Sequence, residues 1–164
     1  MGSILRRVHT TTILMLLCTG CGGSPTAPAS TDLSFDRIDT QRFFNVGGRA
    51  FPVETMLTVT DQGTWTDVWG RLTASSMPPA PLPSVDFTRS SVAVAALGAR
   101  GESCCNIDIT AVRRQASTIV VDVTEVTFTG CDFEQALIGP VVMVTLPVPN
   151  AAPTFNVTRV TRHC

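Results

Sequence analysis

The sequence predicts an α+β domain that is mainly β, with an antiparallel sheet or sandwich of about seven strands and one amphipathic helix. Three features predict this fold: an unbroken apolar run, several alternating segments and one stretch with helical spacing. The apolar run is Val92–Leu97, within residues 84–98. Its β-branched residues and short length favour a strand over a helix, and a strand without polar side chains is covered on both faces. We expect it to be the central strand.

Upstream of this strand the chain shows strand-like spacing in two places. Residues 32–46 are spaced partly like a strand, and Gly47-Gly48 then indicates a hairpin turn. Residues 51–60 alternate between polar and apolar side chains, as a strand with one covered face does.

The single helix is predicted over about residues 61–72. Asp61 is a favourable N-cap, and four apolar residues follow it at the spacing of one helix face. These residues are Trp65, Val68, Trp69 and Leu72. We expect the two tryptophans to pack into the core, because each ring hides about 200 Å² of surface.

Residues 77–83 contain four prolines and predict a stiff, extended connector, since proline fits neither a helix interior nor a central strand. A proline-rich ligand for the groove of a partner is the alternative interpretation. Downstream, residues 104–114 and 118–128 alternate and predict a long antiparallel hairpin with one solvated face. Residues 139–148 predict another strand, and Phe155, Val157 and Val160 predict the last.

The first residues resemble a bacterial lipoprotein signal peptide, residues 1–20. Arg6-Arg7 precede a short apolar core, and Thr19-Gly20 precede Cys21. The resemblance implies cleavage before Cys21 and acylation of its thiol and new amino end. An ordinary secretory signal peptide is the alternative, and both interpretations place the mature protein outside the cytosol.

Residues 21–32 consist of the lipidated Cys21 and a segment rich in Gly, Ser, Pro, Ala and Thr, a composition typical of a flexible tether. A single β-rich domain is then expected over residues 33–164. Acyl chains on Cys21 would hold this domain firmly at a membrane, since each buried methylene contributes about 0.8 kcal/mol. Gly22 after the cysteine, where Asp would favour the inner membrane, favours the outer membrane of a bacterial cell envelope.

The order of motifs in the middle of the chain is distinctive. A helix with Trp-x-x-x-Trp, a proline-rich loop and Val-Asp-Phe before a Val-rich strand follow one another. The residues are Trp65, Trp69, Val85, Asp86, Phe87, Leu97 and Gly98, with the strand Pro140–Pro147. Over roughly residues 54–161 this order resembles the PrcB C-terminal domain family, named after the lipoprotein subunit of a surface protease complex. The resemblance implies a non-catalytic accessory domain, often exported or lipidated.

A catalytic constellation is difficult to assemble from this sequence, so we expect the protein not to be an enzyme and to use no cofactor. His9 lies in the predicted signal peptide, and His163 is next to last, where fixed geometry is least expected. The acidic pairs Asp36/Asp39 and Asp132/Glu134 fit solvated turns better than a calcium site or an acid–base pair. The chain has no basic patch with interleaved aromatics, so nucleic acid is not an expected partner.

Four cysteines remain after Cys21, an even number that suits structural disulfides in an oxidising compartment. They are Cys104, Cys105, Cys131 and Cys164. Neighbouring side chains point to opposite faces of a strand, so each of the adjacent pair should find a different partner. If Arg114 pairs with Thr118, Cys104 lies opposite Phe128 and within reach of Cys131. We predict Cys104–Cys131 and Cys105–Cys164, with the exchanged pairing left open.

A zinc site that uses these cysteines with His163, and a reactive thiol, are the alternatives to disulfides. No metal site is predicted, because zinc ligands are usually spaced C-x₂₋₄-C and adjacent cysteines on a strand diverge. The sequence as a whole predicts a membrane-anchored lipoprotein whose domain binds another exported protein, with a protease among the candidate partners. A small secreted protease inhibitor, with residues 77–83 as its bait loop, and an exported thiol or acid enzyme are the alternatives.

Overall fold

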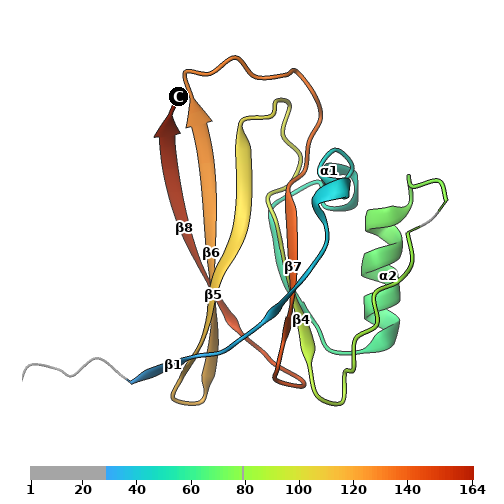
Figure 1. Ribbon diagram of the computed structural model, residues 1–164, viewed down its shortest axis with the longest axis vertical. Helices are drawn as coiled ribbons and strands as arrows, with labels where there is room; N and C mark the ends of the chain where they lie inside the picture. Colours follow the sequence, from blue (N-terminus) through green and yellow to red (C-terminus); the bar gives the residue numbers. More distant parts are fainter. Residues whose placement is uncertain (1–28, 79) are drawn as a thin grey trace, which may run out of the picture.

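The computed structural model describes residues 29–164 except Pro79. Within them the chain is mainly β, as predicted, and forms two four-stranded sheets (Figure 1). Sheet A has the order β1 (Ser30–Asp32), β5 (Cys105–Gln115), β6 (Thr118–Thr129), β8 (Thr154–His163). Sheet B has the order β2 (Asp36–Ile38), β7 (Val141–Leu146), β4 (Ser91–Ala96), β3 (Thr55–Val59). The helices are α1 (Gly47–Ala50), α2 (Gln62–Thr73) and a 3₁₀ turn at Gln41–Phe43.

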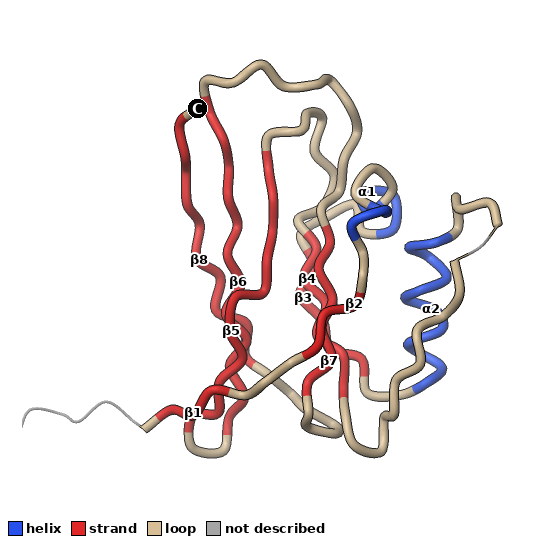
Figure 2. The backbone as a smooth tube through the Cα atoms, viewed as in Figure 1, coloured by secondary structure: helices blue, strands red, loops and turns tan. Residues whose placement is uncertain are grey.

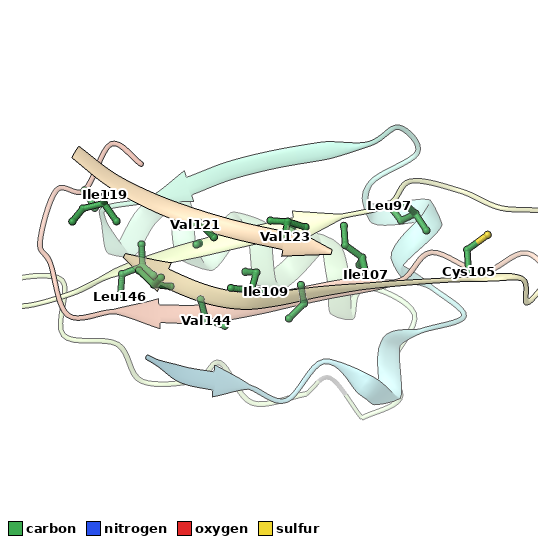
Figure 3. Packing of buried hydrophobic residues seen from close by; sticks show 14 of the residues in the cluster. Leu97, Cys105, Ile107, Ile109, Ile119, Val121, Val123, Val144 and Leu146 are labelled. Atoms are coloured by element: carbon green, nitrogen blue, oxygen red, sulfur yellow. The ribbon is translucent and has the colours of Figure 1, made fainter. Parts of the chain in front are cut away.

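The domain has three layers, since sheet A packs on one face of sheet B and α2 packs on the other (Figures 1 and 2). The core between the sheets includes Ile109, Val121, Val144 and Leu146 (Figure 3). A second core lies between sheet B and α2. The outer face of sheet A is polar, which confirms the solvated face predicted for the long hairpin.

The predicted central strand is confirmed as β4, which lies between β7 and β3 and is buried along its whole length. Its two faces differ in side-chain size. Ala93 and Ala95 face sheet A, whereas Val92 and Val94 face the helix layer. Two cores therefore need an apolar residue at each position from Val92 to Ala96, which explains the unbroken apolar run of β4 after Ser91.

The predicted helix is confirmed as α2. The Asp61 carboxylate caps it by accepting the Thr64 N–H at 2.9 Å. Trp65 and Trp69 are buried, and their indole N–H groups donate to the carbonyls of Pro83 at 2.9 Å and Ala80 at 3.2 Å. Residues Ala80 and Pro83 of the proline-rich segment are thus bound to α2, and their carbonyls satisfy two buried donors. No described helix is long and apolar enough to cross a membrane.

The predicted hairpin is confirmed as β5–β6, with a different register at its turn. Arg114 pairs with Ile119, one position from the predicted Thr118. A β-bulge between Ile109 and Ala111 then shifts the pairing by one residue. At the far end the Phe128 N–H donates to the Cys104 carbonyl at 2.8 Å, so these two residues lie opposite each other as predicted.

Three predictions about the strands are wrong. Residues 30–32, assigned to the tether, form β1 and pair with Arg113–Gln115. Gly47-Gly48 does not turn a hairpin but begins α1, after the 3₁₀ turn. The sheet is not antiparallel throughout, since the last strand, β8, runs parallel to β6. The chain crosses to sheet B for β7 before it returns to sheet A, and this crossover allows the parallel pairing.

The two glycines of α1 are required for space. A Cβ at Gly47 would collide with the carbonyl oxygen of Gly139, and one at Gly48 would lie 2.7 Å from the carbonyl oxygen of Ile138. Backbone from α1 and from the segment before β7 therefore pack directly against each other. A Gly-Gly pair is ambiguous in sequence, because close packing and a tight turn select it equally.

We expect Gly48→Ala to destabilise the fold by about 1–3 kcal/mol, because overpacking against backbone forces the two segments apart. Gly70→Ala is the matched control, since a Cβ at Gly70, in α2, would meet nothing within 4 Å. That change should stabilise the helix by up to about 1 kcal/mol. Urea unfolding measures both, and a Gly48→Ala protein as stable as Gly70→Ala would contradict the close contact.

Candidate functional site

The main candidate site is a cavity of about 440 Å³ at the open side of the sandwich, between the edges of β2 and β5, which we call the edge notch. Apolar side chains from both sheets line it, and polar side chains surround them. The apolar residues include Ile38, Phe44, Ile107 and Val142, and the polar ones include Arg37, Asp39, Asn106 and Asp108. An apolar pocket with a few convergent polar groups is the usual form of a binding site.

One wall of the edge notch is a strand edge that has no other strand of the described residues beside it. β6 pairs with β5 along its length, but on the other side β1 reaches only Arg113–Gln115, and the Leu33 N–H donates to the Val112 carbonyl at 2.8 Å. The Phe128 N–H donates to the Cys104 carbonyl, so the backbone groups of Cys104 point toward β6. This direction alternates along a strand, so the backbone N–H and C=O groups of Cys105, Ile107 and Ile109 point away from β6.

Two side chains occupy part of this edge. The Asn106 side-chain oxygen accepts the Ile107 N–H at 2.8 Å. The Arg37 guanidinium crosses from β2, donates to the Ile109 carbonyl at 2.9 Å and forms a two-pronged bond with Asp108. Native sheets often protect an edge with charged side chains in this way. Arg37 and Asp108 are 50% and 46% exposed, so solvent weakens their attraction.

A second hollow of about 490 Å³ lies on the other side of β2. The proline-rich segment, Trp69 and Asp36 line it, and it shares Arg37 and Asp39 with the edge notch. The short strand β2 is therefore a thin wall between two cavities, and its polar side chains are available to both.

A cluster of four charged residues closes the sandwich near β3 and β8. Glu125 is nearly buried on β6, and the Arg159 guanidinium donates to it at 3.0 Å and to Glu54 at 2.8 and 2.9 Å. Arg100 approaches Glu125 at 3.9 Å. The neighbouring carboxylates raise the pKa of Arg159, with Glu54 the main cause. A buried carboxylate with two arginines is a compensated charge, and we assign this cluster to structure.

On the outer face of sheet A, Asp122 accepts two bonds of 2.6 Å from Arg113 and one of 2.8 Å from Asn156. The Arg113 hydrogen bonds are the main cause of the lowered pKa of Asp122, although partial burial opposes the shift. The contact links β5, β6 and β8 across the sheet. It is a structural brace between strands.

We expect acid to remove the contribution of Asp122. A carboxyl group whose folded pKa is lowered stabilises the fold above its unfolded pKa, near 4, and loses this effect as the pH falls through the folded value. Asp122→Asn should therefore be less stable than the wild type by about 1–3 kcal/mol at pH 7. Urea unfolding near pH 3 should show a smaller difference. The exposed Asp132→Asn is the control, and a gap for Asp122→Asn that is unchanged in acid would contradict the assignment.

The two acidic pairs and His163, which the sequence offered as candidates for chemistry, lie on three different segments of the described chain. Asp36 is the first residue of β2 and Asp39 follows the strand, whereas Asp132 and Glu134 lie on the exposed connection after β6. His163 ends β8 beside Gly130. Over residues 29–164, Pro79 aside, no three His, Cys, Asp or Glu side chains gather in a way that could hold a metal ion. Cys21 and His9 lie outside the described residues.

The predicted cysteine pairing is wrong. The structure brings Cys131 to Cys164, with Cα atoms 5.4 Å apart, and Cys104 to Cys105, and both sulfur pairs are within bonding distance. Cys104 precedes β5, so the alternation of side chains on a strand does not separate it from Cys105. The parallel path of β8 beside β6 carries the C-terminus to Cys131, and the Cys164 N–H donates to the Thr129 carbonyl at 3.1 Å.

Comparison with known proteins adds no assignment: no protein-family model, curated protein or solved structure matches this chain. The resemblance to the PrcB C-terminal domain family therefore stays an expectation. Sequence reasoning missed the edge notch, although Arg37, Asn106 and Asp108 were visible as polar residues near predicted strands. The shortness of β1 is the one signal that a longer neighbouring strand has an open edge, and it appears only when the strands are paired.

Proposed function

We propose that this protein is an exported, lipid-anchored binding module that docks another protein of the bacterial cell envelope, with the outer membrane favoured. The observation that carries this proposal is the edge notch, a partly apolar cavity beside an edge of β5 that pairs with no other described strand. Cysteine pairs at bonding distance suit an oxidising compartment outside the cytosol. Together these features favour recognition over catalysis.

The proposed anchor is the acylated Cys21. Ser30, where β1 begins, follows Cys21 by nine positions, and a chain of that length spans at most about 30 Å. Such a tether would keep the domain close to the lipid surface, where a partner in the same membrane has a high effective concentration. Intact mass after expression in a bacterium should show cleavage before Cys21 plus acyl chains, and Cys21→Ser should release the protein from the membrane fraction.

The binding role is tested by crosslinking in the envelope. A photo-crosslinking amino acid at Gln41, on the rim of the edge notch, should capture a discrete exported protein. The same group at Ser117, in the exposed β5–β6 turn, is the control and should capture none. Equal products from both positions, or none from either, would contradict the proposal. If the resemblance to the PrcB C-terminal domain family extends to function, the captured partner is a protease.

A protease inhibitor is the second candidate function, and the exposure of Met77 favours it. This side chain is 94% exposed, and bonds from Trp69 and Trp65 hold the later residues Ala80 and Pro83 against α2. A rigid loop with a projecting side chain is how small inhibitors present bait. Purified protein should then inhibit a protease that cleaves after Met, and Met77→Asp should abolish the inhibition.

A further inference from the structure

We propose that the open edge of β5 in the edge notch binds an extended peptide by strand addition, with an apolar side chain in the cavity and a basic one beside Asp108. This inference rests on the proposed binding function and names the site and the chemistry of the partner. Strand addition uses backbone hydrogen bonds for affinity and alternate side chains for specificity. The described part of the chain supplies both requirements.

The backbone requirement is met by Cys105, Ile107 and Ile109. Their N–H and C=O groups face the open side of β5, and within the described residues no strand lies beside them. Within residues 29–164, Pro79 aside, the side chains of Asn106 and Arg37 form hydrogen bonds with these groups, at the Ile107 N–H and the Ile109 carbonyl. Both are single side chains at an exposed rim, and an incoming strand would replace their bonds with a regular ladder.

The side-chain requirement follows from alternation along the added strand. Residues opposite Ile107 and Ile109 would point between the sheets, as these isoleucines do, and would enter the cavity beside Ile107 and Val142. Residues between them would point outward, next to the outward-facing Asp108. An apolar residue therefore fits every second position.

The charge of the rim selects the other positions. The edge notch carries the carboxylates of Asp39 and Asp108 against one guanidinium, that of Arg37. When a strand displaces Arg37, Asp108 loses its partner and faces the new strand directly. Opposite charges on neighbouring strands stabilise a sheet, so Lys or Arg is favoured at the outward positions. A peptide that alternates apolar and basic residues meets both demands.

The direction of the added strand is antiparallel to β5, as are its neighbours β1 and β6. In an antiparallel ladder the residue opposite Ile107 exchanges hydrogen bonds with it and shares its face. The apolar residues of the peptide therefore direct their N–H groups to β5, while the basic residues direct theirs to solvent. This difference provides an internal control.

The test uses the full chain in detergent and the fluorescent probe Lys-Val-Lys-Val-Lys-Val-Lys. We expect saturable binding that weakens at least tenfold when the three Val nitrogens are methylated and less than twofold when the inner Lys nitrogens are methylated. Arg37→Ala should strengthen binding of the probe severalfold, because the Ile109 carbonyl loses its hydrogen bond from Arg37 and can accept one from the peptide. The matched control Arg162→Ala, on the exposed end of β8, should leave it unchanged.

Binding that responds equally to both methylation patterns, or that ignores Arg37→Ala, would overturn strand addition at this edge. So would a lack of slowed amide hydrogen exchange at Ile107 and Ile109 when the probe is bound, or no binding of the probe. A dimer of the chain that Arg37→Ala strengthens and the probe does not dissociate would assign the edge to a second copy instead. If Gln41 captures an envelope protein by crosslinking but the probe does not bind, only this inference is refuted. If the probe binds but crosslinking through Gln41 captures no envelope protein, only the proposed function is refuted.

Discussion

Replacing Trp65 by Ala should destabilise the domain by about 3–5 kcal/mol, the largest effect we expect from a single side chain. Trp65 is fully buried between α2 and sheet B, where it contacts Trp69 with ring centroids 5.5 Å apart. The substitution leaves a large cavity and also frees the Pro83 carbonyl from its bond with the indole N–H. Loss of that bond should release the proline-rich segment together with the helix.

Urea unfolding followed by circular dichroism measures this loss. Asp67→Ala, on the exposed face of α2, is the control and should change stability by less than about 0.5 kcal/mol. Trp65→Phe should recover part of the packing but not the hydrogen bond, so its free energy of unfolding should lie between those of Trp65→Ala and Asp67→Ala. A Trp65→Ala protein as stable as Asp67→Ala would contradict the packing of α2 on sheet B.

The second large effect is expected from Cys164→Ser. The pair Cys131–Cys164 closes a loop with a sequence separation of 33, which in the chain-entropy model stabilises the fold by about 3–4 kcal/mol. Its loss should also fray the end of β8, because the pair holds the C-terminus beside β6. Unfolding of the oxidised protein, with amide hydrogen exchange along β8, measures both effects.

Peptide mapping without reduction checks the pairing itself. One crosslinked fragment should join Cys131 to Cys164, and one fragment should contain Cys104 and Cys105 with no link to the rest. The double change of Cys104 and Cys105 to Ser is the control for Cys164→Ser, and it should leave β8 protected. A fragment that joins Cys104 to Cys131 would restore the pairing expected from the sequence and overturn the one in the structure.

The features that sequence predicted well depend on local periodicity. The apolar run of β4, the i, i+3, i+4 spacing of α2 and the alternation of β5 and β6 each reflect which faces of one element are covered. The Asp61 cap is local too, since its bond spans three residues. Such patterns can be recognised without knowing which elements are neighbours, because the spacing of apolar residues within one strand or helix depends on which of its faces is buried.

The failures concern contacts between distant segments. The parallel course of β8, the pairing of Cys131 with Cys164 and the packing of Gly48 on Ile138 each join residues far apart in the chain. The predicted hairpin register differs by one position at Arg114, because the bulge between Ile109 and Ala111 shifts the pairing and moves the next buried position of β5 from residue 111 to Val112. Sequence spacing says little about which strand lies next to which.

The candidate site belongs to this second group. Arg37 and Asp108 are 71 positions apart, and only the arrangement of two sheets brings them together at an open edge. The sequence by itself determined the mainly β class, the central strand and the helix with its two tryptophans, since hydrophobic burial imposes a period on each. Tertiary structure alone decided that, among the described strands, β5 is left with an unpaired edge beside a cavity. A strand acquires an edge through the absence of a neighbour, and no residue within the strand encodes that.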